Sequence, residues 1–295
     1  MRVLLLTNEY PPHFYGGAGV HVEYLSRELA KLTSVEVRTF GDEDARHGAL
    51  YVHGVTVDNT AFAQSPPGFA SPLKALSTCL AFNGLGIEAD VVHCHTWYTH
   101  FGGILAKLLY GLPLVITVHS LEPLRPWKQE QLGRGYYLSS WIEKTALEMA
   151  DAIIAVSRST QTDIARLFTL DADRITVIPN GIDTEEYAPR DDPACLTTYG
   201  IDPEQPYVLF LGRMTPQKGL RHLLRAIPAL EPGVQVVLCA GAADTPEMAR
   251  EIEAEVAQLQ QQRPGVIWIP AMVARRTTIA LYSHCLLYTS PSPRD

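Results

Sequence analysis

The chain has 295 residues, of which 46% are hydrophobic, so it can bury a large core and is expected to form two domains or one large one. Its formal net charge of −8 argues against a nucleic-acid partner, because a phosphate backbone requires a basic surface. No apolar run approaches the roughly 18 residues that span a membrane, and residues 1–10 become polar too early for a signal peptide, so we expect a cytoplasmic protein without a membrane partner.

Short leucine-rich or β-branched runs alternate with longer amphipathic segments in the first part of the chain. This pattern predicts strands at residues 2–7, 34–40, 54–60, 89–96, 113–120, 151–157 and 174–183, and helices at 20–32, 73–87, 101–111, 136–150 and 158–168. Such alternation is typical of an α/β fold with a doubly wound parallel sheet. We therefore assign residues 1–190 to an N-terminal Rossmann-like domain.

A segment rich in Asp, Glu and Pro, near residues 186–205, lacks a clear period and predicts the domain boundary. The pattern then restarts, with strands expected at 207–213, 234–242 and 265–271 and helices at 220–230, 246–262 and 275–285. A doubly wound domain usually has about five or six strands. We therefore expect a second Rossmann-like domain at residues 191–285 that is incomplete.

The last ten residues, 286–295, have no strand or helix period and contain Pro291 and Pro293. Their sequence resembles translated sequencing adaptor, and we interpret them as a non-native tail. A disordered natural tail is the alternative interpretation.

A glycine loop, YGGAG, lies between the first predicted strand and the first predicted helix. Gly16, Gly17 and Gly19 allow a close approach of the backbone, and free N–H groups at the start of a helix favour an anion. The loop is neither a Walker A loop nor GxGxxG, so a simple tight turn is the alternative.

Residues 93–100, HCHTWYTH, combine three histidines with an aromatic pair. His93 and His95 lie on one face of a strand, but no further ligand lies at matching spacing, and the five cysteines show no CxxC pair, so we expect no metal site. We favour a strand end that lines a substrate cleft at His95, with Trp97 as a platform for stacking on a sugar.

The segment TVHSLEPLRPWK follows the predicted strand at 113–120. His119 and Ser120 fall at the carboxyl end of that strand, where doubly wound sheets bind ligands. Arg125 and Lys128 add cations to the same loop. Packing or capping for the histidine and a solvated surface for the cations are the alternatives.

The motif PNGID, at residues 179–183, ends the last predicted strand of the first domain. The proline and the Asn-Gly pair predict a turn. The functional interpretation is that Asn180 belongs to a loop between two domains and lines a ligand cleft.

The stretch GRMTPQKGL, at residues 212–220, places two cations at a predicted strand–loop–helix junction. Arg213 and Lys218 are framed by Gly212 and Gly219, and a helix is expected to begin directly after them. Two cations near a helix start can hold a diphosphate through charge-assisted hydrogen bonds. An ordinary exposed basic loop is the alternative.

With these motifs in this order, the chain resembles the retaining glycosyltransferases of family 4, which have the two-domain GT-B fold. Within that family it is similar to the glycogen synthases of the actinobacterial type, a branch that includes ADP-glucose-dependent maltose-1-phosphate synthases. The resemblance covers residues 1–285, and SLEPLRPWK points to the branch. It rests on TNEYPPHFYGGAGVHVEYLSREL, HCHTW, TVHSLEPLRPWK, WIEKTALEMADAIIAVS, VIPNGID and GRMTPQKGL.

The resemblance implies an acceptor site in the first domain and a sugar-nucleotide site in the second. Arg213 and Lys218 match the residues that stabilise the leaving diphosphate, His119 matches a histidine near the transferred sugar, and Gly17 would approach the donor phosphates. No metal or other cofactor is implied, because the two cations replace Mg²⁺. The implied donor is ADP-glucose, with UDP-glucose as the alternative. The implied acceptor is an α-1,4-glucan or glucose 1-phosphate.

The chain departs from the wider family in two features, one residue and one absent motif. Phe14 stands where plant-like and enterobacterial glycogen synthases carry a Lys before the paired glycines. The E-P-F-G motif, whose following Glu holds the donor ribose, is absent, so we expect an incomplete donor site and an inactive, truncated polypeptide. Three other functions stay open: a sugar-nucleotide 2-epimerase, a transferase to lipid or inositol phosphate, and a non-catalytic glucan-binding fragment.

Overall fold

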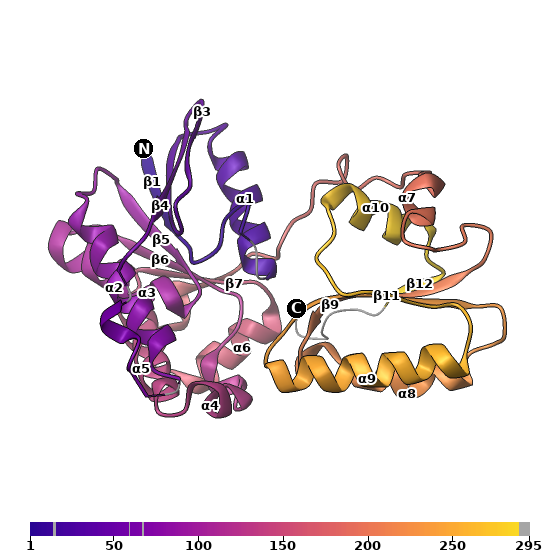
Figure 1. Cartoon of the computed structure of the whole chain (residues 1–295). Coiled ribbons are helices and arrows are strands. Elements are labelled where there is room, and N and C mark those ends of the chain that lie inside the picture. The colour runs from indigo at the N-terminus through magenta and orange to yellow at the C-terminus, as the bar shows by residue number, and fades with distance from the viewer. Residues whose placement is uncertain (14–15, 59, 67, 289–295) are drawn as a thin grey trace. The chain divides into compact units, whose positions relative to one another are not determined.

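The computed structural model describes residues 1–13, 16–58, 60–66 and 68–288 (Figure 1). The chain divides into two compact units, unit 1 at Met1–Asn180 and unit 2 from Gly181 onwards, whereas the sequence placed the boundary after residue 190. Each unit is built on a largely parallel sheet with helices packed against it, so the predicted α/β class is confirmed. No helix of the described residues is long and apolar enough to cross a membrane.

Unit 1 contains an eight-stranded sheet in the order β3-β4-β2-β1-β5-β6-β7-β8. Its neighbouring strands are parallel, except that β3 pairs antiparallel with β4. The sequence did not predict β3, because this four-residue strand is mostly polar and forms one side of a hairpin. The strands are β1 Arg2–Leu6, β2 Ser34–Phe40, β3 Asp44–His47, β4 Leu50–Val55, β5 Val91–His95, β6 Leu114–Val118, β7 Ala152–Ala155 and β8 Ile175–Val177.

Helices lie on both faces of this sheet, and β1 illustrates why. Leu4 and Leu6 pack into one core cluster, whereas Val3 and Leu5 pack into another, because alternate strand residues point to opposite faces. Burying a leucine contributes roughly 1.5–3 kcal/mol. The helices are α1 Gly17–Leu29, α2 Ala70–Gly84, α3 Trp97–Tyr110, α4 Trp127–Leu132, α5 Gly135–Met149 and α6 Arg158–Leu167, with 3₁₀ turns η1 Thr60–Phe62, η2 Glu122–Leu124 and η3 Ala172–Arg174.

The direction of strand addition reverses at β1, which has β2 on one side and β5 on the other. In doubly wound sheets, ligands bind beyond the carboxyl ends of the strands at such a switch point. The fold therefore directs attention to the residues that follow β1, β5 and β6.

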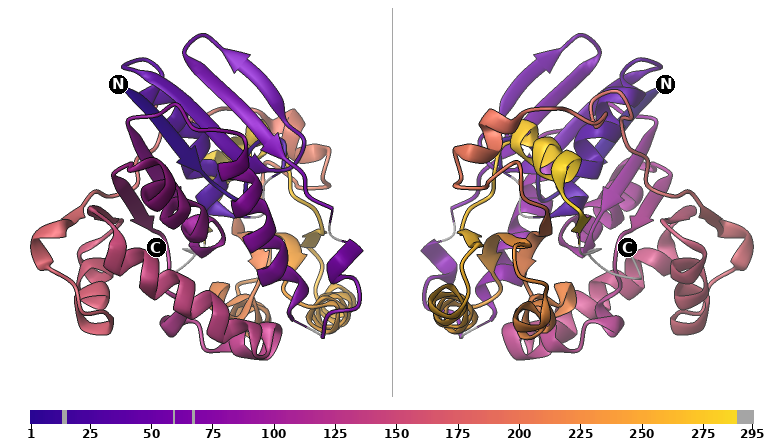
Figure 2. Two further views of the ribbon diagram at one scale, coloured as in Figure 1. Left: turned by 90° about the vertical axis from the view of Figure 1, so that its left-hand side faces the viewer. Right: turned by 90° about the vertical axis from the view of Figure 1, so that its right-hand side faces the viewer.

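Unit 2 has a four-stranded parallel sheet in the order β11-β10-β9-β12. In Figures 1 and 2, α8 and α9 cover one face and α7 and α10 the other, in agreement with two separate core clusters. The elements are α7 Pro193–Thr197, β9 Tyr207–Met214, η4 Pro216–Lys218, α8 Leu220–Ala226, η5 Ile227–Ala229, β10 Gln235–Ala243, α9 Pro246–Gln262, β11 Val266–Ile269, α10 Arg275–His284 and β12 Leu287–Tyr288.

The predicted tail begins with regular structure. Leu287 and Tyr288 form β12 and pair with Val208 and Leu209 of β9, so the expectation of no strand is wrong for these two residues. Residues 289–295 lie outside the described part of the chain.

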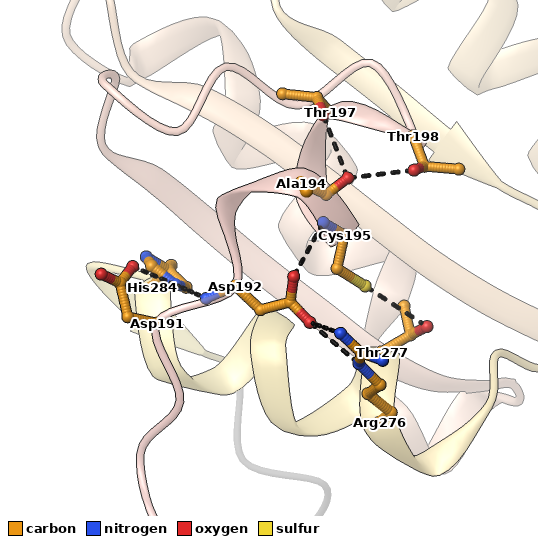
Figure 3. Close-up of polar contacts among 9 residues, drawn as sticks. All are labelled: Asp191, Asp192, Ala194, Cys195, Thr197, Thr198, Arg276, Thr277 and His284. Carbon is orange, nitrogen blue, oxygen red and sulfur yellow. Dashed lines mark hydrogen bonds and ion pairs between the residues drawn. The ribbon is translucent and has the colours of Figure 1, made fainter.

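The segment expected to be a linker contributes α7 to unit 2 (Figure 3). The Asp192 carboxylate accepts a hydrogen bond from the backbone N–H of Cys195, which caps α7. Its other oxygen accepts two hydrogen bonds from Arg276 of α10, at 2.9 and 2.8 Å. The same aspartate therefore begins α7 and fastens it to α10.

Candidate functional site

The carboxyl ends of β1 and β5 are tied together by one side-chain hydrogen bond. Thr96, directly after β5, donates from Oγ1 to Asn8 Oδ1 at 2.7 Å. Thr96 has φ 67° and ψ 153°, a region that is rarely occupied by residues other than glycine and costs roughly 1–3 kcal/mol. Strain of this kind persists only where surrounding contacts enforce it, which marks this strand end as a candidate site.

Four histidines gather at the same end of the sheet, and we call them the histidine cluster: His21 of α1, His93 and His95 of β5, and His119 directly after β6. His95 Nδ1 lies 3.1 Å from His119 Nε2, which is a hydrogen bond. The ring centroid of His21 lies 4.8 Å from that of His119, edge to face. His93 is held by Thr117, with 2.7 Å between Nε2 and Oγ1.

Burial keeps this cluster uncharged. Desolvation lowers the pKa of His93 and of His119 to about 3, and it lowers the pKa of His95 and of His21 as well. At neutral pH the four imidazoles are therefore neutral. They can donate or accept hydrogen bonds, but they contribute no positive charge toward a phosphate.

Among the residues that the structure describes, two groups of side chains have the donor atoms and spacing for a metal ion. One contains His21, His95 and His119, with ligand atoms within 4.8 Å of one another. The second contains His13, Asp42 and Glu43 at similar spacing. The sequence suggested only His93 and His95 as a candidate pair of metal ligands. The fold instead brings His21 and His119 to His95 from other elements.

The glycine loop is already occupied by a carboxylate of the protein. Gly16 is the N-cap of α1, and its N–H donates to Glu9 Oε2 at 2.7 Å. The N–H of Gly16 is therefore bound within the protein, and the role of Gly16 in a substrate site stays a prediction. Gly17 is exposed, with open space where a Cβ would lie, and Gly19 is buried. The predicted approach of Gly17 to donor phosphates stays a prediction, and Phe14 lies outside the described residues.

Two predicted contacts with substrate are buried in the protein. Trp97 is only 5% exposed, stacks on Tyr98 with 4.2 Å between ring centroids, and belongs to a core cluster with Ala75 and Ile142. Its indole has no exposed face for a sugar, so the structure assigns Trp97 to the core. His95 is completely buried and contacts His119 instead of solvent.

The loop after His119 is organised around a buried acid. Ser120 is exposed, whereas Arg125 is partly buried and its Nη1 lies 3.5 Å from Oε1 of the buried Glu122. The backbone N–H of Glu122 donates to Glu143 at 2.9 Å. Burial, and then the neighbouring Glu122, raise the pKa of Glu143 well above its ordinary value. Arg125 therefore compensates a carboxylate within the loop.

Two further predicted site residues of unit 1, Lys128 and Asn180, are not fully buried. Lys128 is partly buried in α4, and Asn180 is exposed at the end of unit 1.

The two predicted site cations of unit 2 lie at the connection from β9 to α8. Gly212 and Arg213 are part of β9 rather than of a loop, and Lys218 ends η4. Arg213 Nη1 lies 3.6 Å from Oδ1 of Asp244, a buried carboxylate directly after β10. Gly219 has φ 70°, which favours glycine, and begins the seven-residue α8. The positive charge of this connection therefore comes mainly from Arg213 and Lys218 and less from the start of the short helix α8.

Sequence reasoning missed Asn8, Glu9, His21, Thr96 and Asp244. Asn8 and Glu9 come two and three residues after β1, and Asp244 directly follows β10, so the strand-end rule applied to His119 would have found them. Thr96 lies at such an end too, but its backbone conformation has no sequence signal. His21 had none either, since one histidine inside a helix identifies no partner.

Comparisons with known proteins agree with this architecture. Residues 15–186 match the model of Glycosyltransferase Family 4. The alpha-maltose-1-phosphate synthase of Mycolicibacterium smegmatis is 47% identical over 99% of this chain and 74% of its own length. The enzyme of the same name from Mycobacterium tuberculosis is 45% identical with the same coverage. A glycogen synthase of M. tuberculosis is 29% identical over 81% of this chain and 61% of its own length.

Solved structures show the same fold. A sucrose-phosphate synthase from Thermosynechococcus elongatus has a TM-score of 0.76 at 18% identity, covering 97% of this chain and 74% of that one. The catalytic domain of starch synthase IV from Arabidopsis thaliana, bound to ADP and acarbose, has a TM-score of 0.71 at 18% identity, covering 97% and 77%. These GT-B neighbours confirm the predicted fold of two Rossmann-like, parallel-sheet units.

Proposed function

The chain belongs to glycosyltransferase family 4, and from this premise we propose that it transfers glucose from ADP-glucose to glucose 1-phosphate with retention of the α configuration. It is a sugar-nucleotide glycosyltransferase, and the products of the proposed reaction are α-maltose 1-phosphate and ADP. The bond between glucose C1 and the diphosphate breaks, and a bond from C1 to the O4 hydroxyl oxygen of glucose 1-phosphate forms.

One observation carries the choice of acceptor. Identity to two alpha-maltose-1-phosphate synthases is 47% and 45% over 99% of the chain, whereas identity to the glycogen synthase is 29% over 81%. The name of the first relatives describes a glucose unit joined to glucose 1-phosphate. The likeness to the glycogen synthase supports the other candidate acceptor, an α-1,4-glucan.

The proposed chemistry assigns a separate task to each unit. Arg213 and Lys218 of unit 2 bind the diphosphate and stabilise the negative charge that grows as it leaves. His119 of unit 1 contacts the sugar that is transferred. A departing phosphate oxygen takes the proton of the attacking hydroxyl on the same face of the sugar, which gives retention. The cations replace a divalent ion, so the reaction requires no cofactor.

The remaining predicted site residues keep secondary roles in this proposal. Gly17 lies near the phosphates of the donor. Ser120, Lys128 and Asn180 provide polar contacts to the substrates, and Arg125 keeps its loop in place through Glu122.

The test compares acceptors and donors on the purified chain. ADP-glucose or UDP-glucose, labelled in the sugar, is incubated with glucose 1-phosphate or with glycogen, and the products are separated by anion exchange and identified by ³¹P and ¹H NMR. We expect α-maltose 1-phosphate from ADP-glucose. Label in glycogen alone would favour the glucan acceptor, and a free epimerised sugar would favour the 2-epimerase.

Donor binding is measured beside turnover, because the chain spans 74% of the length of the synthases. Calorimetry with ADP-glucose and UDP-glucose gives the preferred base. Binding of neither nucleotide by a folded chain would contradict the proposed donor site.

A further inference from the structure

We propose that His95 is a positioning residue that binds Nε2 of His119, so that the N–H group at Nδ1 of His119 is presented to the sugar. That a sugar is the ligand of His119 rests on the proposed function, whereas the position of the proton on each ring does not. His95 is completely buried and His119 is partly exposed, so only the second ring is available to a ligand.

The geometry leaves two arrangements for the proton between the rings. With 3.1 Å between His95 Nδ1 and His119 Nε2, one nitrogen must carry a hydrogen and the other must accept it. If His95 donates, both rings carry their proton on Nδ1. If His119 donates, both rings carry it on Nε2.

The other nitrogen of His95 decides between them. His95 Nε2 is buried and has no hydrogen-bond partner among the residues that the structure describes. If Nε2 carried the hydrogen, the interior would contain an unpaired N–H. Buried N–H groups without partners are rarer than buried acceptors with unused lone pairs. We therefore place the hydrogen of His95 on Nδ1, donated to His119, which leaves Nδ1–H on His119.

The surroundings fix His95 and keep the pair neutral. His95 is the last residue of β5, paired in register with Thr117 of β6, and its ring lies against that of His93, with 4.3 Å between centroids. Burial lowers the pKa of His119 to about 3 and that of His95 well below its ordinary value. Each ring therefore carries one proton at neutral pH.

This assignment defines what His119 can do chemically. A neutral imidazole with a pKa near 3 is a poor general base at pH 7. Its Nδ1–H is a directed donor for a neutral oxygen, such as a hydroxyl of a sugar. His119 therefore recognises the sugar by hydrogen bonding, and His95 determines the direction of that bond.

The first test reads the proton directly. The intact chain is labelled with ¹⁵N-histidine, long-range ¹H–¹⁵N correlations are recorded at pH 7, and the ring of His119 is assigned with a His119→Ala variant. We expect the hydrogen on Nδ1 of both His95 and His119. A hydrogen on Nε2 of His119 would overturn the proposal whether or not the chain transfers glucose. A metal ion present in stoichiometric amount and bound to His95 Nδ1 and His119 Nε2 would overturn it too, because neither nitrogen could then carry the shared hydrogen.

Two variants of His95 separate positioning from simple packing. The amide nitrogen of His95→Asn reaches about the position of Nδ1, whereas that of His95→Gln reaches about that of Nε2. We expect His95→Asn to retain the Nδ1–H form of His119, and His95→Gln to lose it together with roughly a hundredfold in transfer rate, the loss typical of a misplaced contact group. His47→Asn, at an exposed histidine of β3, is the matched control. Equal effects of Asn and Gln on the His119 spectrum would contradict the assignment.

Discussion

The first strand-to-helix turns of the two units differ in charge. In unit 1, the sequence between β1 and α1 contains no lysine or arginine, and the N–H of Gly16 donates to the carboxylate of Glu9. In unit 2, the turn from β9 to α8 carries Arg213 and Lys218. Two turns with the same topology and similar glycines are therefore suited to different ligands.

The side chains, rather than the glycines, set this difference. A free helix start attracts an anion, but an internal carboxylate satisfies that attraction during folding. Unit 2 has a carboxylate too: Asp244 lies 3.6 Å from the guanidinium of Arg213, and Lys218 ends η4 in the same connection. This comparison predicts a diphosphate site in unit 2 and a neutral, hydroxyl-binding site in unit 1.

The largest effect is expected from the cations of unit 2. Arg213→Ala and Lys218→Ala should each lower the transfer rate roughly 10²–10³-fold, the loss typical when a group that stabilises developing charge is removed. Each should also weaken binding of ADP, measured by calorimetry. Arg221→Ala, at an exposed arginine paired with Glu251, is the control. Unchanged ADP affinity in both variants would contradict a diphosphate site at Arg213 and Lys218.

Acid should destabilise unit 1 before unit 2. Burial lowers the pKa of His93 and of His100 to about 3, whereas the unfolded chain takes up these protons near 6.5. Stability is therefore full above pH 6.5 and falls as the pH drops, by about 2 kcal/mol for each such histidine at pH 5. The two histidines of unit 2, His222 and His284, are not buried.

Hydrogen exchange at pH 7 and pH 5 measures this difference unit by unit. Both ring nitrogens of His100 are buried without partners among the described residues, so His100→Phe should stabilise unit 1 and flatten its pH dependence. Equal losses of protection in both units would argue against the histidines as the cause.

Asp244→Asn tests whether the carboxylate beside Arg213 orients the guanidinium. Removing the charge 3.6 Å from Arg213 should leave the guanidinium less well oriented, and we expect roughly a tenfold lower transfer rate, the cost of about 1.4 kcal/mol. Folding should be retained because the shape of the side chain is preserved. A rate equal to that of the unmodified chain would mean that the aspartate does not orient Arg213.

The smallest effect is expected in the first turn of unit 1. Glu9→Gln keeps the shape of the side chain but removes the negative charge at the start of α1, and we expect the free energy of unfolding to fall by about 1 kcal/mol. Thermal unfolding measures this, with Glu28→Gln, an exposed residue of the same helix, as the control. A new affinity of the Glu9→Gln variant for inorganic phosphate would show that the carboxylate excludes anions.

The sequence predicted the architecture because it depends on periodic patterns. Alternating apolar runs located β1, β5 and β6, and glycines framed the turn that holds Arg213 and Lys218. Contacts that depend on packing could not be predicted in this way. Trp97 looked like a cleft residue because it follows a strand end, yet the helix it begins turns the indole into the core.

Partners far apart in sequence were the second limit. The charge of Arg213 was evident, but its neighbour Asp244 comes from the next strand of the sheet. His119 was predicted from its strand end, whereas its bond to His95 depends on the register between β5 and β6. Only the fold brings such side chains together.

The strained threonine between β5 and α3 has a consequence for the thermodynamics of ligand binding. Thr96 is held in its uncommon conformation by the bond to Asn8, so the ends of two strands are fixed by folding itself. Conformational entropy at these positions is then lost when the chain folds, and a ligand does not have to order them again. A small Thr96 hydroxyl therefore makes the candidate site of unit 1 a preorganised surface.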